Sequence, residues 1–302
     1  MSIYVEIRIR APMQALWDHT QRPEIHERWD LRFSEITYLP RPDESKPQRF
    51  RYATRIGGGV TIEGEGESVG TRDLSNGQRV SALSFSSSDP RSLILRGSGY
   101  WKYIPTDDGI RFLTRYDYET RFGTIGRIVD RIVFRPLIGW ATAWSFDRLR
   151  LWLERNVDPR SARRQWLTHS VARVGLAIIF AYHGLVPKLL LSHPDELAML
   201  RDLGVPPGQL QLLAFGFGVG EMLFALCLLT FWRSRWPVVL TVGFALIATL
   251  VVGSASPRYL GAAFNPITLD LAVLCLAVVD LLSLSDLPTA YHCLRAPPPN
   301  ET

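Results

Sequence analysis

Hydrophobic and polar positions follow different patterns in the two halves of the chain. Before about residue 120, apolar residues alternate with polar ones in short runs, with breaks such as GGG at 57 and SNG at 75. This alternation predicts a strand at 3–10 and five or six strands within 31–119. Helical spacing predicts two short helices at 12–20 and 22–28 and a long helix at 124–154, kinked at Pro136. The first half is therefore expected to be an α+β domain.

One hairpin can be placed in register. Arg49 and Arg51 share one face of QRFRYATR, and Glu65 and Glu67 share one face of VTIEGEGES. A turn at the glycines 57–59 sets Arg51 opposite Glu65 and Arg49 opposite Glu67. Facing opposite charges stabilise a strand pair by about 0.2–1 kcal/mol. A metal site at EGEGE is the alternative; we favour the charge-matched sheet face and predict no metal.

The second half contains four long apolar segments. They span residues 168–191, 209–231, 236–254 and 266–285. Each approaches the roughly 20 apolar residues that cross a bilayer. A buried hairpin of a soluble protein is the alternative, but four such segments leave too little polar surface to cover them. We predict an all-α four-helix transmembrane bundle.

The charges are distributed unequally between the two halves. Residues 1–165 hold 27 of the 34 Lys and Arg residues and 21 of the 29 Asp and Glu residues. The arginines of the short loops lie mainly on one side of the four segments: Arg155, Arg160, Arg163, Arg164, Arg233, Arg235 and Arg295. The positive-inside tendency then predicts an inner-membrane protein with both termini cytoplasmic. The arginines of the first half alternate with acids, which favours contact with anionic lipid over nucleic acid.

The chain is accordingly divided into four parts. We expect a cytosolic domain at 1–155, a basic linker at 156–167, a membrane domain at 168–288 and a Pro-rich tail at 289–302. The start MSIYVEIRIRAP alternates like a strand and lacks the apolar core of a signal peptide. Cys227 and Cys275 lie in predicted spans, Cys293 lies in the tail, and no CxxC occurs, so no thiol relay is expected.

The first half resembles a known superfamily. A strand and two short helices carry Pro23, His26 and Trp29 in a Pro-x-x-His-x-x-Trp element, and strands and a long helix follow. This order resembles the START-like polyketide cyclase/dehydrase and lipid-transport superfamily (SRPBCC) over residues 1–155. The resemblance implies a helix-grip fold around an apolar cavity for lipids, quinone-like molecules, polyketides or hormones. Some members catalyse a reaction, while many only carry a ligand.

Aromatic residues on the expected inward faces are the candidates for the cavity wall. They are Trp29, Phe33, Tyr52, Phe85, Trp101, Phe112 and Tyr116, and each one is alternatively a core residue. His19 is expected at the surface and His26 in packing, and no Ser/His/Asp or Cys/His constellation can be placed. The catalytic residues are therefore unknown, and binding or transport without catalysis is favoured.

The second half resembles a membrane family. The stretches GLVPKLLLSHPDELAML (184–200), FGVGEML and AAFNPITLDLAVL (262–274) resemble the DoxX-like family over residues 170–285. That family is related to a small subunit of thiosulfate:quinone oxidoreductase. This chain has Asp270-Leu271 where the resemblance leads us to expect an Asn-Leu pair. A role that depends on a side-chain amide at this position is therefore not inferred for this chain.

Polar residues inside the predicted spans form the second candidate site. They are Arg173, His183, Lys188, Glu221, Asn265, Asp270 and Asp280. At about 1.5 Å per residue, Arg173 matches Asp280 in depth near the inner edge, His183 matches Glu221 near mid-membrane, and Lys188 matches Asp270 toward the outer side. Such groups are costly in hydrocarbon, so they either pair to hold the bundle together or handle protons or quinone.

The spacing of Gly216 and Gly220 predicts a close helix contact beside Glu221.

Two functions follow as hypotheses. In the first, the cytosolic domain binds an apolar molecule, such as a lipid, an isoprenoid or a quinone-like compound, and presents it at the inner leaflet through the bundle. In the second, the chain is the membrane subunit of a quinone-linked oxidoreductase. No cofactor is predicted from the residues themselves, quinone is the candidate, and a redox role requires a partner subunit. A homo-oligomer is a further expectation.

Overall fold

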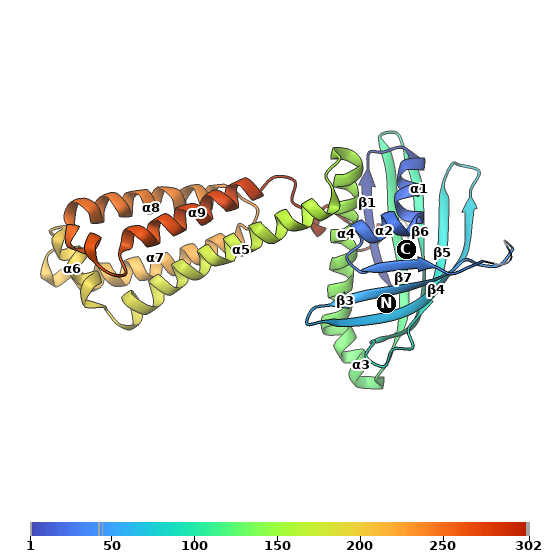
Figure 1. The fold of residues 1–302 in the computed structure, drawn as a ribbon, viewed down its shortest axis with the longest axis horizontal. Helices are drawn as coiled ribbons and strands as arrows, with labels where there is room; N and C mark the ends of the chain where they lie inside the picture. The colour runs from blue at the N-terminus through green and yellow to red at the C-terminus, as the bar shows by residue number, and fades with distance from the viewer. Residues whose placement is uncertain (1, 42, 44, 300–302) are drawn as a thin grey trace. The chain divides into compact units, whose positions relative to one another are not determined.

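The computed structural model describes residues 2–41, 43 and 45–299. It divides the chain into two compact units. The first comprises Met1–Arg163 with Pro288–Thr302, and the second comprises Arg164–Leu287. Figure 1 shows a sheet with helices in the first unit and long helices in the second.

The first unit contains one antiparallel sheet. Within the described residues it has seven strands in the order β1-β7-β6-β5-β4-β3-β2. The strands are β1 (Ile3–Ile9), β2 (Glu35–Tyr38), β3 (Arg49–Ile56), β4 (Val60–Asp73), β5 (Arg79–Ser86), β6 (Ile94–Thr106) and β7 (Gly109–Thr120). Pairing of β1 with β7 brings the first strand of the chain beside the last one. Every other neighbouring pair is consecutive in sequence, which explains why local alternation predicted the strands.

Helices cover one face of this sheet (Figure 1). They are α1 (Met13–Gln21), α2 (Pro23–Trp29), α3 (Gly123–Val129) and α4 (Arg135–Arg155), and a π-helical turn at Asp130–Phe134 joins α3 to α4. Pro136 lies in the first turn of α4, directly after this π-helical turn, so the helical segment continues through the proline. Phe146 and Leu149 of α4 are fully buried in one core with Val5 and Phe112 of the sheet. The sheet thus packs along a long helix, which confirms the predicted helix-grip (START-like) fold class.

The predicted hairpin register is also confirmed. Arg49 lies opposite Glu67 and Arg51 opposite Glu65 in the β3–β4 pair. Glu65 contacts both arginines: its facing residue Arg51, with Nε 3.7 Å from Oε1, and diagonally Arg49, with Nη2 2.7 Å from Oε2. Glu67 instead accepts a hydrogen bond from Ser84 of β5 at 3.3 Å.

The linker and the tail differ from the expected boundaries. Only residues 156–158 separate α4 from α5 (Pro159–His183), so the arginines of the expected linker 156–167 are already helical. The tail packs on the first unit, where Leu294 pairs with Glu6 of β1. Thr289 N donates to Asp147 Oδ2 at 2.8 Å, and Cys293 is buried against α4. The tail is therefore part of the fold, and its residues 300–302 lie outside the described range.

The second unit is an all-α bundle. Four helical stretches are long and apolar enough to cross a membrane: Pro159–Leu190, Pro207–Thr230, Trp236–Ala255 and Pro266–Ser283. They contain α5 with a π-helical end at Gly184–Leu190, α7 (Leu210–Thr230), α8 (Trp236–Ala255) and α9 (Pro266–Ser283). A short helix, α6 (Pro194–Asp202), lies between the first and second stretches. All four predicted spans are confirmed as helices of membrane length.

Candidate functional site

A cavity of about 180 Å³ lies between the inner face of the sheet and the helices of the first unit. Its wall is formed by α1, α2, strands β2 to β7 and Ile138 of α4. Five of the seven aromatic candidates line this cavity, namely Phe33, Tyr52, Phe85, Trp101 and Tyr116. The fold therefore brings side chains that are far apart in sequence together on the wall of one cavity.

The other two candidates, Trp29 and Phe112, lie in the core rather than on the cavity wall. Both are fully buried. The Phe112 ring stacks on Phe146 of α4 with centroids 4.5 Å apart. Trp29 Nε1 donates to the carbonyl oxygen of His19 at 2.8 Å. Trp29 and Phe112 lie where the helices pack on the sheet. Side chains of the helices therefore fill the space that a ligand would need there.

Strand glycines make room for the aromatic rings of this wall. A Cβ atom on Gly66 would lie 2.4 Å from the Phe50 ring, and one on Gly97 would lie 2.6 Å from the Phe85 ring. Larger residues at these positions would push the rings into the cavity. The glycines of β4 and β6 thus set the cavity's shape through close packing.

A buried charged cluster borders the cavity. The Asp30 carboxylate is fully buried and accepts hydrogen bonds from Arg32 Nη2 at 2.6 Å and from Arg32 Nε at 2.9 Å. His26 Nε2 lies 3.0 Å from the same carboxylate. Burial by itself favours neutral Asp30, but the Arg32 charge and the bonds from His26 and Arg32 lower its pKa below the ordinary value. Asp30 is therefore an ionised anchor for two side chains of the cavity wall.

The sequence analysis gave His26 a packing role and missed its link to Asp30. The ring does pack, since it stacks on Trp29 with centroids 4.9 Å apart. It also bonds the carboxylate one helical turn later. The i, i+4 spacing of His26, on the predicted helix at 22–28, and Asp30, just beyond its end, was the signal that could have indicated the bond.

The remaining polar groups of the wall are mostly neutral. Burial raises the pKa of Tyr52 to about 12, so its hydroxyl stays protonated. The Tyr116 hydroxyl shares a hydrogen bond with Thr142 at 2.9 Å. Among the residues that the structure describes, the lining includes no carboxylate and no thiol, and Arg32 is its one permanent cation. Such a wall can bind through apolar contact and hydrogen bonds.

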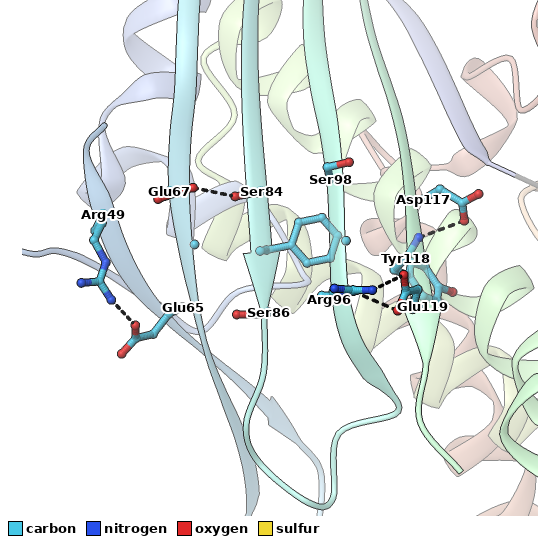
Figure 2. Close-up of a pocket in the computed structure, with 13 residues that line it drawn as sticks. Arg49, Glu65, Glu67, Ser84, Ser86, Arg96, Ser98, Asp117, Tyr118 and Glu119 are labelled. Carbon is cyan, nitrogen blue, oxygen red and sulfur yellow. Dashed lines mark hydrogen bonds and ion pairs between the residues drawn. The ribbon is translucent and has the colours of Figure 1, made fainter. Parts of the chain in front are cut away.

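A second hollow lies on the outer face of the same sheet. This open depression measures about 650 Å³ and is lined by residues of β3 to β7. Figure 2 shows the polar side chains that line it. Its charges pair with each other: Arg49 with Glu65 at 2.7 Å and Arg96 with Glu119 at 2.9 Å. Exposed pairs of this kind are typical of a solvated sheet face. We therefore place the candidate ligand site in the inner cavity.

In the bundle, Arg173 and Asp280 form the expected ion pair. Arg173 Nε lies 2.7 Å from Asp280 Oδ2, and both side chains are fully buried. His169, which the sequence analysis did not single out, lies 2.5 Å from the other oxygen of Asp280. Arg173 Nη2 also donates to the Ser234 carbonyl at 3.1 Å. The cluster joins α5, α9 and the turn between α7 and α8.

Glu221 pairs with a residue other than the expected one. The matched pairs placed it with His183, but Lys188 Nζ lies 3.1 Å from Glu221 Oε1. Lys188 also contacts Glu196 of α6 at 3.4 Å. The π-helical turn from Gly184 to Leu190 changes the direction in which residues after His183 point, and the sequence did not reveal it.

Asp270 and Asn265 have local roles. Asp270 accepts a hydrogen bond from Thr249 of α8 at 3.0 Å, whereas Lys188, which was expected at the same depth, pairs with Glu221. Asn265 is the N-cap of α9 and accepts a hydrogen bond from the Thr268 amide at 2.9 Å. Neither residue joins the group around Glu221.

The close helix contact beside Glu221 involves different glycines from those expected. A Cβ atom on Gly184 would lie 2.6 Å from the Gly218 carbonyl oxygen and 3.1 Å from Glu221 Cβ. For Gly216 and Gly220, a Cβ atom would meet no other atom within 4 Å. The tight contact thus lies between α7 and the π-helical end of α5, through Gly218.

Known proteins resemble the two parts of the chain. A model of the DoxX-like family matches residues 177–278. The uncharacterized membrane protein YndG of Bacillus subtilis (strain 168) is 46% identical over 183 residues, which are 60% of this chain and 68% of that protein.

Solved structures resemble about half of the chain. The STAR-related lipid transfer protein from Xanthomonas axonopodis is 15% identical with a TM-score of 0.38, over 50% of this chain and 85% of that one. The di-domain ARO/CYC StfQ from the steffimycin biosynthetic pathway is 12% identical with a TM-score of 0.38, over 51% of each chain.

The fold and the spans define a multi-pass membrane protein that combines a helix-grip unit with a bundle of four membrane-length helices. Residues 177–278 form a DoxX-like domain, and the chain is a relative of the membrane protein YndG.

Proposed function

We propose that the helix-grip unit binds a compact apolar molecule in its inner cavity and that the bundle keeps this unit at the membrane. The observation that carries the proposal is the cavity itself, whose wall includes eight Phe, Tyr and Trp residues and carries Arg32 and His26. A wall of this kind matches the usual ligand site, which is apolar with a few placed polar groups.

The size of the cavity restricts the ligand. Pockets for drug-sized molecules measure roughly 300–1,000 Å³. A cavity of about 180 Å³ accommodates one ring system and is too small for a whole phospholipid. We therefore favour a quinone-like ring or the end of an isoprenoid, with its oxygen or hydroxyl group toward Arg32.

Membrane topology is part of the same proposal. Residues 288–299 pack on the same unit as the N-terminal residues, so both ends of the bundle lead into one unit. This arrangement requires an even number of crossings. Arg233 and Arg235 lie between the second and third spans, so two crossings return them to the membrane side on which the chain leaves the helix-grip unit and enters the first span. The positive-inside tendency then favours the cytoplasmic side of the inner membrane for that unit.

The test compares two neighbouring residues of β5. Leu83 lines the inner cavity, whereas Ser84 lines the outer depression. The full-length protein, purified in mild detergent, is analysed by native mass spectrometry with extraction of bound molecules. We expect a stoichiometric ligand in the wild type and in Ser84→Trp, and its loss in Leu83→Trp because the indole fills the cavity. Equal retention in both variants, or no ligand in the wild type, would contradict the proposal.

A second candidate function rests on the pair of Lys188 and Glu221. This pair lies in the membrane-length helices at a π-helical turn, a feature that is frequent at functional sites. We propose it as the place where a quinone-linked subunit with a redox partner would bind quinone or handle protons. The test is Glu221→Gln, assayed for quinone binding and for thermal stability. Lost quinone binding with unchanged stability supports the function, whereas lost stability alone indicates a structural pair.

A further inference from the structure

An exposed apolar surface runs along the helical segment that follows the sheet. It comprises Phe122, Ile125, Ile128, Val129, Ile132, Val133 and Leu137, from α3 to the first turn of α4, and we name it the α3–α4 band. Exposure ranges from 45% for Val129 to 74% for Ile125. A contiguous apolar surface of this kind marks a binding face rather than scattered surface residues.

The band belongs to a segment that is fixed to the fold. Asp130 is buried on the opposite side, where the Tyr118 hydroxyl donates to it at 2.6 Å and Arg135 Nε at 2.8 Å. Phe134 packs against the core of the first unit. The segment is therefore anchored by its inner side, and the band faces away from the sheet.

Within residues 122–137 the exposed charged side chains are arginines, and the neighbouring acid of β7, Asp117, is paired with Arg135 at 3.0 Å. Asp130 is the one acid in residues 122–137, and it is buried and paired. Arg127 and Arg131 are exposed. An apolar helix face bordered by arginines is typical of helices that lie in the plane of a membrane interface, where cations meet anionic headgroups.

We propose that the α3–α4 band docks on the surface of the bilayer that the four spans cross. Its apolar side chains enter the boundary between headgroups and acyl chains, and Arg127 and Arg131 contact anionic lipid. The spans keep the first unit beside the bilayer, so docking needs no separate recruitment. Leu137 of the band directly precedes Ile138 of the cavity wall, so docking brings this wall next to the lipid.

The test places a fluorophore on the band in full-length protein. Cys227, Cys275 and Cys293 are replaced by alanine, and NBD is attached at Ile132→Cys, where the native side chain is 69% exposed. The matched control is Val69→Cys, where the native side chain of β4 is 61% exposed. Both proteins are reconstituted in phosphatidylcholine vesicles with and without phosphatidylglycerol, and are quenched by acyl-chain doxyl lipid or by aqueous iodide.

We expect doxyl lipid to quench the label at position 132 several-fold more than the label at position 69, and iodide to show the reverse order. Phosphatidylglycerol should increase this difference, and Arg127→Gln with Arg131→Gln should reduce it. Equal iodide quenching at both positions would overturn the proposal. Shielding from both quenchers would also overturn it, because the band then contacts protein; dependence on the protein-to-lipid ratio would identify that protein as a second copy.

Discussion

The two units bury the same three residue types in different ways. Asp30 pairs with Arg32 and His26 in the helix-grip unit, and Asp280 pairs with Arg173 and His169 in the bundle. Both aspartates are fully buried. The first cluster comes from seven consecutive residues, whereas His169 and Asp280 are 111 positions apart. One cluster shapes a cavity wall, and the other joins helices.

The exposure of the arginine to water decides how much stability each cluster loses when its aspartate is removed. Arg32 retains 13% side-chain exposure and lines the cavity, so water can reach it if the carboxylate is lost. Arg173 has no exposure and lies in a membrane-length helix. An unpaired charge in hydrocarbon has no solvent to replace its partner. Loss of the aspartate should therefore destabilise the bundle more than it destabilises the helix-grip unit.

Asp280→Ala should produce the largest effect, since it leaves the Arg173 charge buried without a partner. We expect the free energy of unfolding to fall by about 3–5 kcal/mol. Denaturant unfolding of the full-length protein in mixed micelles measures it. Asp270→Ala is the control, because Asp270 accepts a hydrogen bond from Thr249 and forms no ion pair in the described chain. Equal losses in both variants would refute a special role of the Asp280 cluster.

Asp30→Asn should have an intermediate effect of about 1.5–3 kcal/mol, as expected for hydrogen bonds to a charged group. Hydrogen exchange of the α2 amides measures this loss of stability in the helix-grip unit, because α2 belongs to that unit and not to the bundle. The pKa of Asp30 is lowered on folding, so its stabilisation is complete above its unfolded pKa of about 4 and is lost as pH falls below that value. The wild type should lose α2 protection in acid more steeply than Asp30→Asn; parallel pH profiles would contradict the ion pair.

Gly184→Ala tests the helix contact beside Glu221. The added methyl group would lie 2.6 Å from a backbone oxygen, so the helices must separate. We expect a loss of about 1–3 kcal/mol from overpacking. Gly216→Ala is the matched control with no atom within 4 Å, and it should be neutral in thermal unfolding. A neutral Gly184→Ala would show that α5 and α7 are not in close contact there.

Arg49→Ala should have the smallest effect. It removes an ion pair with Glu65 whose side chains are 61% and 46% exposed. Such pairs contribute about 0.2–1 kcal/mol and are screened by salt. The loss of stability should disappear at high ionic strength. A larger loss that persists in salt would mean that the outer sheet face has a structural role that its exposure does not indicate.

The sequence predicted features that depend on local periodicity. The hairpin register followed from alternating charges on either side of a glycine turn, and the structure has the same register. The four spans followed from length and apolarity alone. Four of the five cavity residues, all but Phe33, lie on strands and could be selected because strand alternation tells which side chains share a face. The same alternation could not separate these four from Phe112, which also points inward but packs on α4.

By itself, the sequence determined the fold class of both units and the strand faces, because these are set by backbone hydrogen bonding and by the period of apolar residues. Only the tertiary structure decided the partner of Glu221, because one π-helical turn shifts the following side chains by up to about 100° around the helix. It also decided that residues 289–294 belong to the first unit and that Trp29 is core. Contacts between distant segments depend on helix rotation and packing, which a pattern of hydrophobic and polar positions does not encode.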